Sequence, residues 1–288
     1  MTLPAFDVLK PQTLDEALEM VAKDPQAMPI AGGTNLIVDA RAGKLKPETV
    51  IDLSALDELQ DIAVEGHEMA IGACVTIAEL LDDPDIRQYA PVLSAAAQTF
   101  ANTLIRHRAT VGGNLVNNAP CADTAPALLV LDANVELASL VGTRSLPLEE
   151  FLLSPFATKR QSNEILTAVR FPIPPTSAMV RFQKMGLRKI SCMAKVDVAM
   201  LLDFDHSGIC TDARIALAAA CPVAFRARDA EEALVGQRLT AESIQAAANL
   251  AEQAAVPRPG SEYKQQVVAG LTRRLLSEIA EEVGETHV

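Results

Sequence analysis

The stretch Ile30-Ala-Gly-Gly-Thr-Asn-Leu36 follows a short apolar strand signal at residues 28–30 and precedes a helix-like segment. Two adjacent glycines after a strand let the backbone approach a bulky ligand and turn its amide groups toward an anion. Thr34 and Asn35 add side chains that can bond a diphosphate. The stretch has neither the G-x-G-x-x-G spacing of a Rossmann site nor the lysine of a P-loop. Alone, it predicts either a phosphate-binding loop or a glycine turn closed by a side-chain hydrogen bond.

A second glycine pair lies in Ala109-Thr-Val-Gly-Gly-Asn114, and Asp123 follows it closely. A ligand with a sugar chain, a diphosphate and a ring system needs donors and acceptors from more than one loop. Two such loops in one domain therefore favour a dinucleotide-type ligand. The alternative is a β-bulge or a barrel-corner glycine pair, in which the neighbouring polar residues satisfy turns.

Helix and strand signals alternate around the two glycine pairs. The capping boxes Thr13-Leu-Asp-Glu16 and Thr76-Ile-Ala-Glu79 each predict the start of a helix. Helical periodicity recurs from residue 92 to about residue 104. Strands are expected near residues 28–30, 48–53, 68–75, 134–138 and 164–171.

The proline-rich stretch Phe171-Pro-Ile-Pro-Pro-Thr-Ser177 is the best candidate for a linker, because its prolines favour an extended connector. After it, strands are expected near residues 180–184, 197–203 and 213–219, followed by helices after Thr240 and over residues 261–283. Strands followed by helices indicate an α+β domain. We therefore expect one domain over residues 1–175, with subdomains at about 1–55 and 56–175, and a second over residues 176–288.

Composition excludes several classes of function. The formal net charge of −12 argues against a nucleic-acid partner, which requires clustered Lys and Arg. The five cysteines include no C-x-x-C pair and the four histidines are scattered, so no metal site is expected in this chain. No residues form a recognisable catalytic constellation. With no apolar run of about 20 residues and no signal-peptide pattern at the N-terminus, a cytoplasmic location is expected.

The two glycine motifs together with Asp123 resemble the FAD-binding medium subunit of the molybdenum hydroxylases. That family includes the flavoprotein subunits of xanthine dehydrogenases, carbon monoxide dehydrogenases and 4-hydroxybenzoyl-CoA reductases. The resemblance runs essentially end to end. It implies an FAD-binding domain of the vanillyl-alcohol-oxidase (PCMH) type. A smaller α+β domain of the CO dehydrogenase flavoprotein type would follow, with a three-stranded sheet and helices.

The resemblance also implies which residues contact FAD. The first loop would wrap the diphosphate, the second would form a wall beside the diphosphate and ribityl chain, Asp123 would bond the sugar portion, and Leu166 and Lys184 would lie beside the flavin. The implied cofactor-binding residues are Ile30, Ala31, Gly32, Gly33, Thr34, Asn35, Leu36, Ala109, Thr110, Gly112, Gly113, Asn114, Asp123, Leu166 and Lys184. For Lys184 the alternative is an ordinary exposed lysine.

Two departures from the family pattern bear on the chemistry. The reductase branch carries a cysteine-rich insert for an iron–sulfur cluster after the second motif, whereas Asn114 here runs to Asp123 with the single Cys121. This chain should therefore hold FAD alone. Asn35 also stands where fused relatives have an acidic residue, which changes the expected surroundings of the diphosphate.

The resemblance implies an electron-transfer subunit of an oxidoreductase, with substrate chemistry on another chain. The expected partners are a small 2Fe-2S subunit and a large molybdenum-pterin subunit, assembled as a heterohexamer that is a dimer of heterotrimers. Electrons would pass from the iron–sulfur clusters through FAD to NAD or another acceptor. The alternatives are a stand-alone FAD-dependent oxidoreductase of the same superfamily and a scaffold protein in which both glycine loops are plain turns.

Overall fold

The computed structural model describes residues 3–188 and 191–286. Its contacts divide the chain into two compact units, each built from several segments. The first comprises Met1–Asp83, Ala101–Asn118 and Ala133–Pro172, and the second comprises Pro84–Phe100, Ala119–Asp132 and Ile173–Val288. Two segments from the N-terminal half therefore pack with the C-terminal part of the chain.

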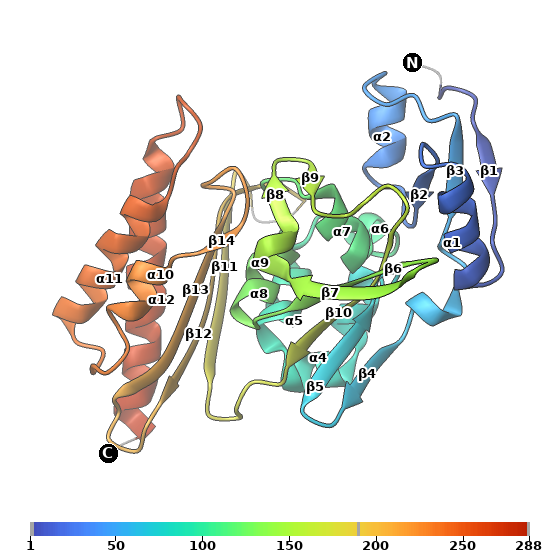
Figure 1. The fold of residues 1–288 in the computed structure, drawn as a ribbon. Helices are drawn as coiled ribbons and strands as arrows, with labels where there is room; N and C mark the ends of the chain where they lie inside the picture. The colour runs from blue at the N-terminus through green and yellow to red at the C-terminus, as the bar shows by residue number, and fades with distance from the viewer. Residues whose placement is uncertain (1–2, 189–190, 287–288) are drawn as a thin grey trace. The chain divides into compact units, whose positions relative to one another are not determined.

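Two sheets frame the first unit (Figure 1). A parallel sheet has the order β1–β3–β2, with β1 at Asp7–Leu9, β3 at Thr49–Asp52 and β2 at Met28–Ile30. An antiparallel sheet has the order β4–β5–β10–β6–β7, and a small hairpin pairs β8 with β9. The bounds are β4 Ile62–Glu65, β5 Glu68–Gly72, β10 Ile165–Pro172, β6 Asn134–Ser139, β7 Gly142–Pro147, β8 Leu152–Ser154 and β9 Ala157–Thr158.

The strands expected from apolar runs are confirmed, and the additional ones have a simple explanation. Strand β7 is almost wholly exposed, so its sequence Gly-Thr-Arg-Ser-Leu-Pro carries no apolar period that could reveal it. It pairs only with β6, as the edge strand of its sheet. Backbone pairing, rather than a buried face, thus holds such strands in place.

Side-chain caps begin two helices of the first unit, α1 and α3, where the sequence predicts them. Thr13 Oγ1 accepts a hydrogen bond from Glu16 N at 3.2 Å, and both halves of the box at Thr76 and Glu79 are formed. Each cap stabilises its helix by about 1 kcal/mol. The helices are α1 Leu14–Lys23, α2 Leu36–Arg41, α3 Ile77–Asp82, α6 Thr103–Arg106, α7 Val111–Asn117 and α9 Leu148–Phe151, with a 3-10 turn at Asp57–Leu59.

The helical pattern expected over residues 92–104 is interrupted. Helix α5 ends at Thr99 and α6 begins at Thr103, because Ala101 adopts a left-handed conformation with φ of 37°. A helix cannot continue through such a residue. Only α5 buries apolar side chains, whereas α6 has no buried residue and its Leu104 is 81% exposed, so the apolar pattern continues past the end of the buried helix face.

The second unit is built on an antiparallel sheet of order β11–β12–β13–β14, with β11 at Met179–Gly186, β12 at Ala194–Phe204, β13 at Cys210–Ala218 and β14 at Phe225–Arg226. The three expected strands are present, but the sheet has four rather than three. Strand β14 is two residues long, too short to produce a periodic signal. The helices are α4 Pro84–Tyr89, α5 Pro91–Thr99, α8 Thr124–Val130, α10 Arg228–Glu232, α11 Ala241–Ala254 and α12 Tyr263–Thr286.

Helices cover both faces of this sheet (Figure 1). Alternate residues of β12, Val196, Val198, Met200 and Leu202, are buried in one cluster with side chains of α11 and α12. Side chains along a strand point alternately to opposite faces, so Asp197 and Ala199 face the other side, where α5 and α8 pack. The sheet is therefore buried on both faces, and Asp197 lies within the interior.

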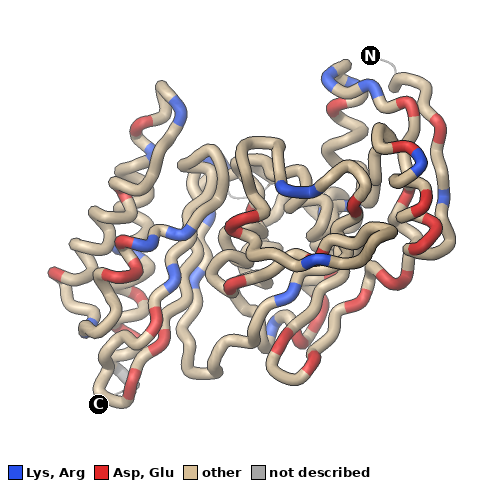
Figure 2. The backbone as a smooth tube through the Cα atoms, in the orientation of Figure 1, with Lys and Arg blue, Asp and Glu red and all other residues tan. Residues whose placement is uncertain are grey.

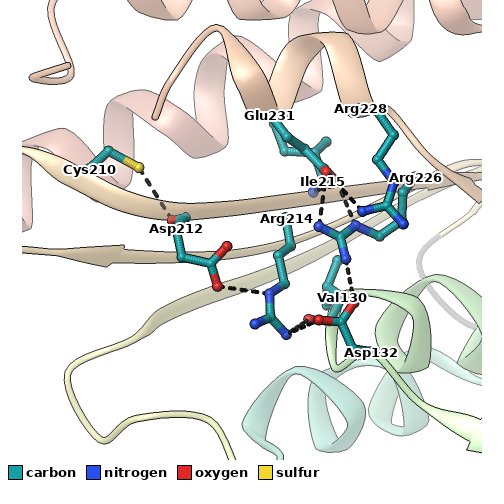
Figure 3. Close-up of polar contacts among 9 residues, drawn as sticks. All are labelled: Val130, Asp132, Cys210, Asp212, Arg214, Ile215, Arg226, Arg228 and Glu231. Atoms are coloured by element: carbon teal, nitrogen blue, oxygen red, sulfur yellow. Dashed lines mark hydrogen bonds and ion pairs between the residues drawn. The ribbon is translucent and has the colours of Figure 1, made fainter. Parts of the chain in front are cut away.

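A network of ion pairs ties α8 and α10 to the same sheet (Figure 3). Arg226 is paired with Glu231 at 2.6 Å and also with Asp132, while Arg214 bonds Asp132 and Asp212 at 2.7 and 2.8 Å. Glu231 in addition accepts from Ile215 N at 2.8 Å. Removing one partner of a buried ion pair leaves the other charge buried and unpaired, which is strongly unfavourable. The network therefore fixes the end of α8 against β13 and β14.

Charged positions are interspersed along each unit (Figure 2). Of the described residues, no group of three or more His, Cys, Asp or Glu could hold a metal ion. None of the described helices is long and apolar enough to cross a membrane.

Candidate functional site

The first glycine loop packs against the backbone that leads into the second. A Cβ atom on Gly32 would lie 1.5 Å from the carbonyl oxygen of Arg108, so only glycine fits there. The adjacent Gly33 has φ of +68°, which is also costly for other residues. These two requirements bring residues 30–36 directly beside residues 108–109 in the first unit.

Among the residues that the structure describes, none bonds the amides in the middle of the first loop. The carbonyls of Gly33 and Asn35 accept from Ile37 and Asp39, which begins the ladder of α2. Over residues 3–188 and 191–286, however, no acceptor is bonded to the amides of residues 32–35. Asn35 occupies the N-cap position of α2 without capping it through its side chain. A run of unbonded N–H groups beside a glycine turn is a suitable cradle for an anionic group.

The second glycine motif has a different structure from the loop that its composition suggests. Thr110 caps helix α7, with Oγ1 accepting from Gly113 N at 3.1 Å. The amides of Val111, Gly112 and Asn114 donate to Val75, Ala73 and Thr110 carbonyls at 3.0, 2.9 and 2.9 Å. The backbone donors of residues 111–114 are thus already satisfied, and a ligand must use the remaining surface of the motif.

The two glycines of this second pair differ in their surroundings. A Cβ on Gly112 would lie 2.6 Å from Ala73 Cβ, inside the packed backbone. A Cβ on Gly113 would approach only Thr110 Oγ1, at 2.9 Å, and Gly113 is exposed. Gly112 therefore serves packing, whereas Gly113 leaves an open surface at the first turn of α7.

Leu166 lies close to the second motif through a short chain of hydrogen bonds. Gly112 N donates to Ala73 O, and Ala73 N donates to Thr167 O at 2.8 Å. Leu166 precedes Thr167 on β10 and is 4% exposed. Ala109 is also buried, and its carbonyl accepts from Ile77 N at 2.9 Å. The first unit thus gathers both glycine motifs and Leu166 into one neighbourhood.

The remaining two predicted residues, Asp123 and Lys184, bond each other in the second unit. Lys184 Nζ donates to Asp123 Oδ2 at 2.7 Å and to Thr99 O at 3.2 Å. The two side chains are 5% and 6% exposed, so the alternative of an ordinary exposed lysine is wrong. Asp123 stands at the N-cap of α8 but its carboxylate bonds Lys184 instead of the helix amides. The pair is therefore formed at the expense of a helix cap.

Asp197 completes this cluster. It lies directly opposite Lys184 in the β11–β12 register, is wholly buried, and its carboxyl group is within hydrogen-bonding reach of Asp123. Burial, and then the charge of Asp123, raises the pKa of the Asp197 carboxyl well above its usual range. Burial likewise raises the pKa of Asp123, while the Lys184 ammonium acts in the opposite direction.

Sequence reasoning did not single out Asp197, although a signal was present. Asp197 interrupts the run Val196-Asp-Val-Ala-Met-Leu-Leu202, the central part of β12, whose other residues are all apolar. An acidic residue within a continuous apolar strand marks a buried carboxyl group, and such a group needs a partner. The sequence does not show which residue that partner is. In the structure it is Asp123, at the N-cap of α8.

Comparison with known proteins identifies the class. Residues 4–174 match the family described as "FAD binding domain in molybdopterin dehydrogenase", and residues 181–279 match "CO dehydrogenase flavoprotein C-terminal domain". These two matches define a flavoprotein subunit of an oxidoreductase complex. The chain belongs to the family of FAD-binding medium subunits of the molybdenum hydroxylases.

Similar proteins cover nearly the whole chain. The nicotinate dehydrogenase FAD-subunit of Eubacterium barkeri is 31% identical, with 96% of this chain and 97% of that protein aligned. The carbon monoxide dehydrogenase medium chain of Afipia carboxidovorans is 29% identical over 94% and 95% of the two chains. A chain of quinoline 2-oxidoreductase from Pseudomonas putida 86 superposes with a TM-score of 0.92 at 29% identity, covering 98% and 99%. The resemblance predicted from the glycine motifs is confirmed.

Proposed function

We propose that this chain binds FAD through the residues implied by its glycine motifs and passes electrons from the 2Fe-2S clusters of a small subunit to NAD or another acceptor. Substrate would be oxidised on a large molybdenum-pterin subunit. The three subunits would form a dimer of heterotrimers. A cytoplasmic location fits the five cysteines, all of which are free thiols.

The observation that carries the proposal is the run of unbonded amides over residues 32–35. These groups match the diphosphate of FAD, which needs donors of fixed geometry. Gly113 offers an open backbone surface nearby in the same unit, and Leu166 adds an apolar side chain. The residues present in the first unit therefore fit the phosphate-containing part of the cofactor.

Lys184 and Asp123 fit a different part of it. An ammonium has three hydrogens, and Lys184 uses two of them on Asp123 and Thr99. In the described part of the chain, the third has no acceptor. Bound FAD supplies the redox chemistry, and this chain contributes binding, orientation and a nearby charge. The donor that remains on Lys184 suits a carbonyl or ring nitrogen.

Purification tests the proposal. The chain, co-expressed with candidate small and large subunits, should copurify with both and carry stoichiometric FAD, identified by release with acid and chromatography. The native mass should correspond to two copies of each subunit. A chain that purifies without flavin, and takes up none when FAD is added, would contradict the binding proposal. A flavin-loaded chain that oxidises a substrate alone would instead favour the stand-alone oxidoreductase.

A further inference from the structure

The buried cluster of Asp123, Lys184 and Asp197 contains two carboxyl groups and one cation. Lys184 bonds Asp123 Oδ2 but is not bonded to Asp197. Asp123 Oδ1 and both carboxyl oxygens of Asp197 are buried and accept no hydrogen bond from the described residues. Two ionised carboxylates in contact would leave one buried charge without a partner, which is strongly unfavourable.

A proton retained by one of the two carboxyl groups removes the unpaired negative charge. If one carboxyl group keeps its proton, it donates to the other, and the cluster becomes neutral with one ammonium, one carboxylate and one carboxylic acid. Asp197 is the better candidate for the acid. It is 0% exposed against 4% for Asp123, and the ammonium is bonded directly to Asp123.

We propose that Asp197 is a positioning residue that stays protonated at neutral pH and shares its proton with Asp123. The proton holds the Asp123 carboxylate in place, and that carboxylate in turn orients the Lys184 ammonium. Asp197 acts through these neighbours and touches no ligand itself. Its consequence for a bound flavin rests on the function proposed above, whereas its protonation does not.

Few other titratable groups lie near enough to Asp197 to hold or share this proton. From β11 it faces Lys184, from α8 it faces Asp123, and from β13 it is paired in register with Ala218. The thiols of Cys121 and Cys192 are also close enough to interact with it. Burial, followed by the charge of Asp123, raises the pKa of the Cys121 thiol, so that thiol adds no negative charge. The opposite face of β12 packs in the apolar cluster with α11 and α12.

Infrared spectroscopy of the purified full-length chain tests the proposal directly. The wild type at pH 7 should show the carbonyl band of a protonated carboxylic acid, which Asp197→Asn should lose. Asp229→Asn, which changes an exposed aspartate of α10, should keep the band. A band of undiminished intensity in Asp197→Asn, or no such band in the wild type, overturns the proposal.

Two further measurements keep the test decisive. If Asp197→Asn does not fold, the wild-type band is followed alone: it should persist well above the ordinary aspartate range of about pH 4, and its loss near that pH overturns the proposal. FAD content is measured on the same samples. A chain that shows the band but binds no FAD refutes the proposed function and leaves the protonation of Asp197 supported.

Discussion

The two glycine pairs look alike in the sequence and differ in the structure. The amides of residues 32–35, which include Gly32 and Gly33, bond nothing among the described residues. The amides of Gly112 and Gly113, in contrast, donate to Ala73 O and Thr110 Oγ1. The first pair can therefore offer backbone donors to an anion, and the second cannot. A repeated motif predicts a shared place in the fold better than it predicts a shared chemical role.

The charged cluster of the second unit differs from both pairs. The glycine loops present backbone dipoles, which do not titrate, whereas Asp123, Lys184 and Asp197 can change their net charge with pH. We therefore expect substitutions in the first unit to alter cofactor binding or folding. Substitutions in the cluster should alter potentials and pH dependence.

The largest effect is expected within each glycine pair. Gly32→Val and Gly112→Val place a Cβ into backbone atoms of Arg108 and into Ala73, so each should lower the free energy of unfolding by about 4 kcal/mol or more. Gly113→Val approaches only Thr110 Oγ1, so it should at most weaken that helix cap, at a cost of about 1 kcal/mol. Urea titrations of the three variants measure the difference. Equal stability of all three would remove the distinction between the tightly packed Gly32 and Gly112 and the open Gly113.

The next effect concerns binding. Gly113→Val keeps the fold but covers the open surface at the start of α7, so FAD affinity should fall at least about tenfold, or about 1.4 kcal/mol. Gly270→Val, in open space on α12, is the matched control and should keep full flavin content. Flavin absorbance per chain decides the matter. Full occupancy of Gly113→Val would mean that this surface does not face the cofactor.

The cluster should give the second unit a pH dependence that the glycine loops lack. A carboxyl group with a raised pKa in the folded state binds more protons there than in the unfolded chain, so stability falls as pH rises above about 4. Relative to the wild type, Asp197→Asn should gain about 1.4 kcal/mol of stability per pH unit until the folded pKa is reached. Thermal unfolding at several pH values measures this slope. A parallel pH dependence in both proteins would show that Asp197 is ionised in the fold.

The smallest effect is on the flavin potential. With Lys184 beside the flavin as proposed, Lys184→Met removes a positive charge that would stabilise a reduced, anionic flavin, so the midpoint potential should fall by about 30 mV, which corresponds to about 1.4 kcal/mol. Asp123→Asn removes the opposing charge and should raise the potential. Redox titration of the FAD-loaded variants gives both values. Unchanged potentials in both would place the cluster away from the flavin.

The sequence predicts most of the framework because the relevant signals are local. A side-chain cap at Thr13 and a full capping box at Thr76 mark the starts of α1 and α3, and apolar runs reveal β6, β10 and the long strands of the second sheet. The edge strand β7 and the two-residue β14 are formed by pairing alone, so no local pattern reveals them. The break at Ala101 depends on a left-handed residue that is not glycine.

In the candidate site, too, the sequence predicts the local features and misses the contacts that form only on folding. The glycine motifs and Lys184 are visible as residue types in a recognisable order, and the family they indicate is confirmed by matches to residues 4–174 and 181–279. The separate roles of Gly112 and Gly113, and the contact between Asp197 and Asp123, depend on chain segments brought together by folding. Neither can be read from spacing along the chain. The individual cofactor contacts remain a prediction.

Anaerobic stopped-flow spectroscopy of flavin bleaching tests the electron-transfer account most directly. The FAD-loaded chain is mixed with candidate purine, aldehyde or heteroaromatic substrates, first alone and then with its iron–sulfur and molybdenum partners. The account predicts no bleaching by substrate in the isolated chain and rapid bleaching in the reconstituted complex. Bleaching by substrate in the isolated chain would contradict it, because the chain would then carry out the substrate oxidation itself.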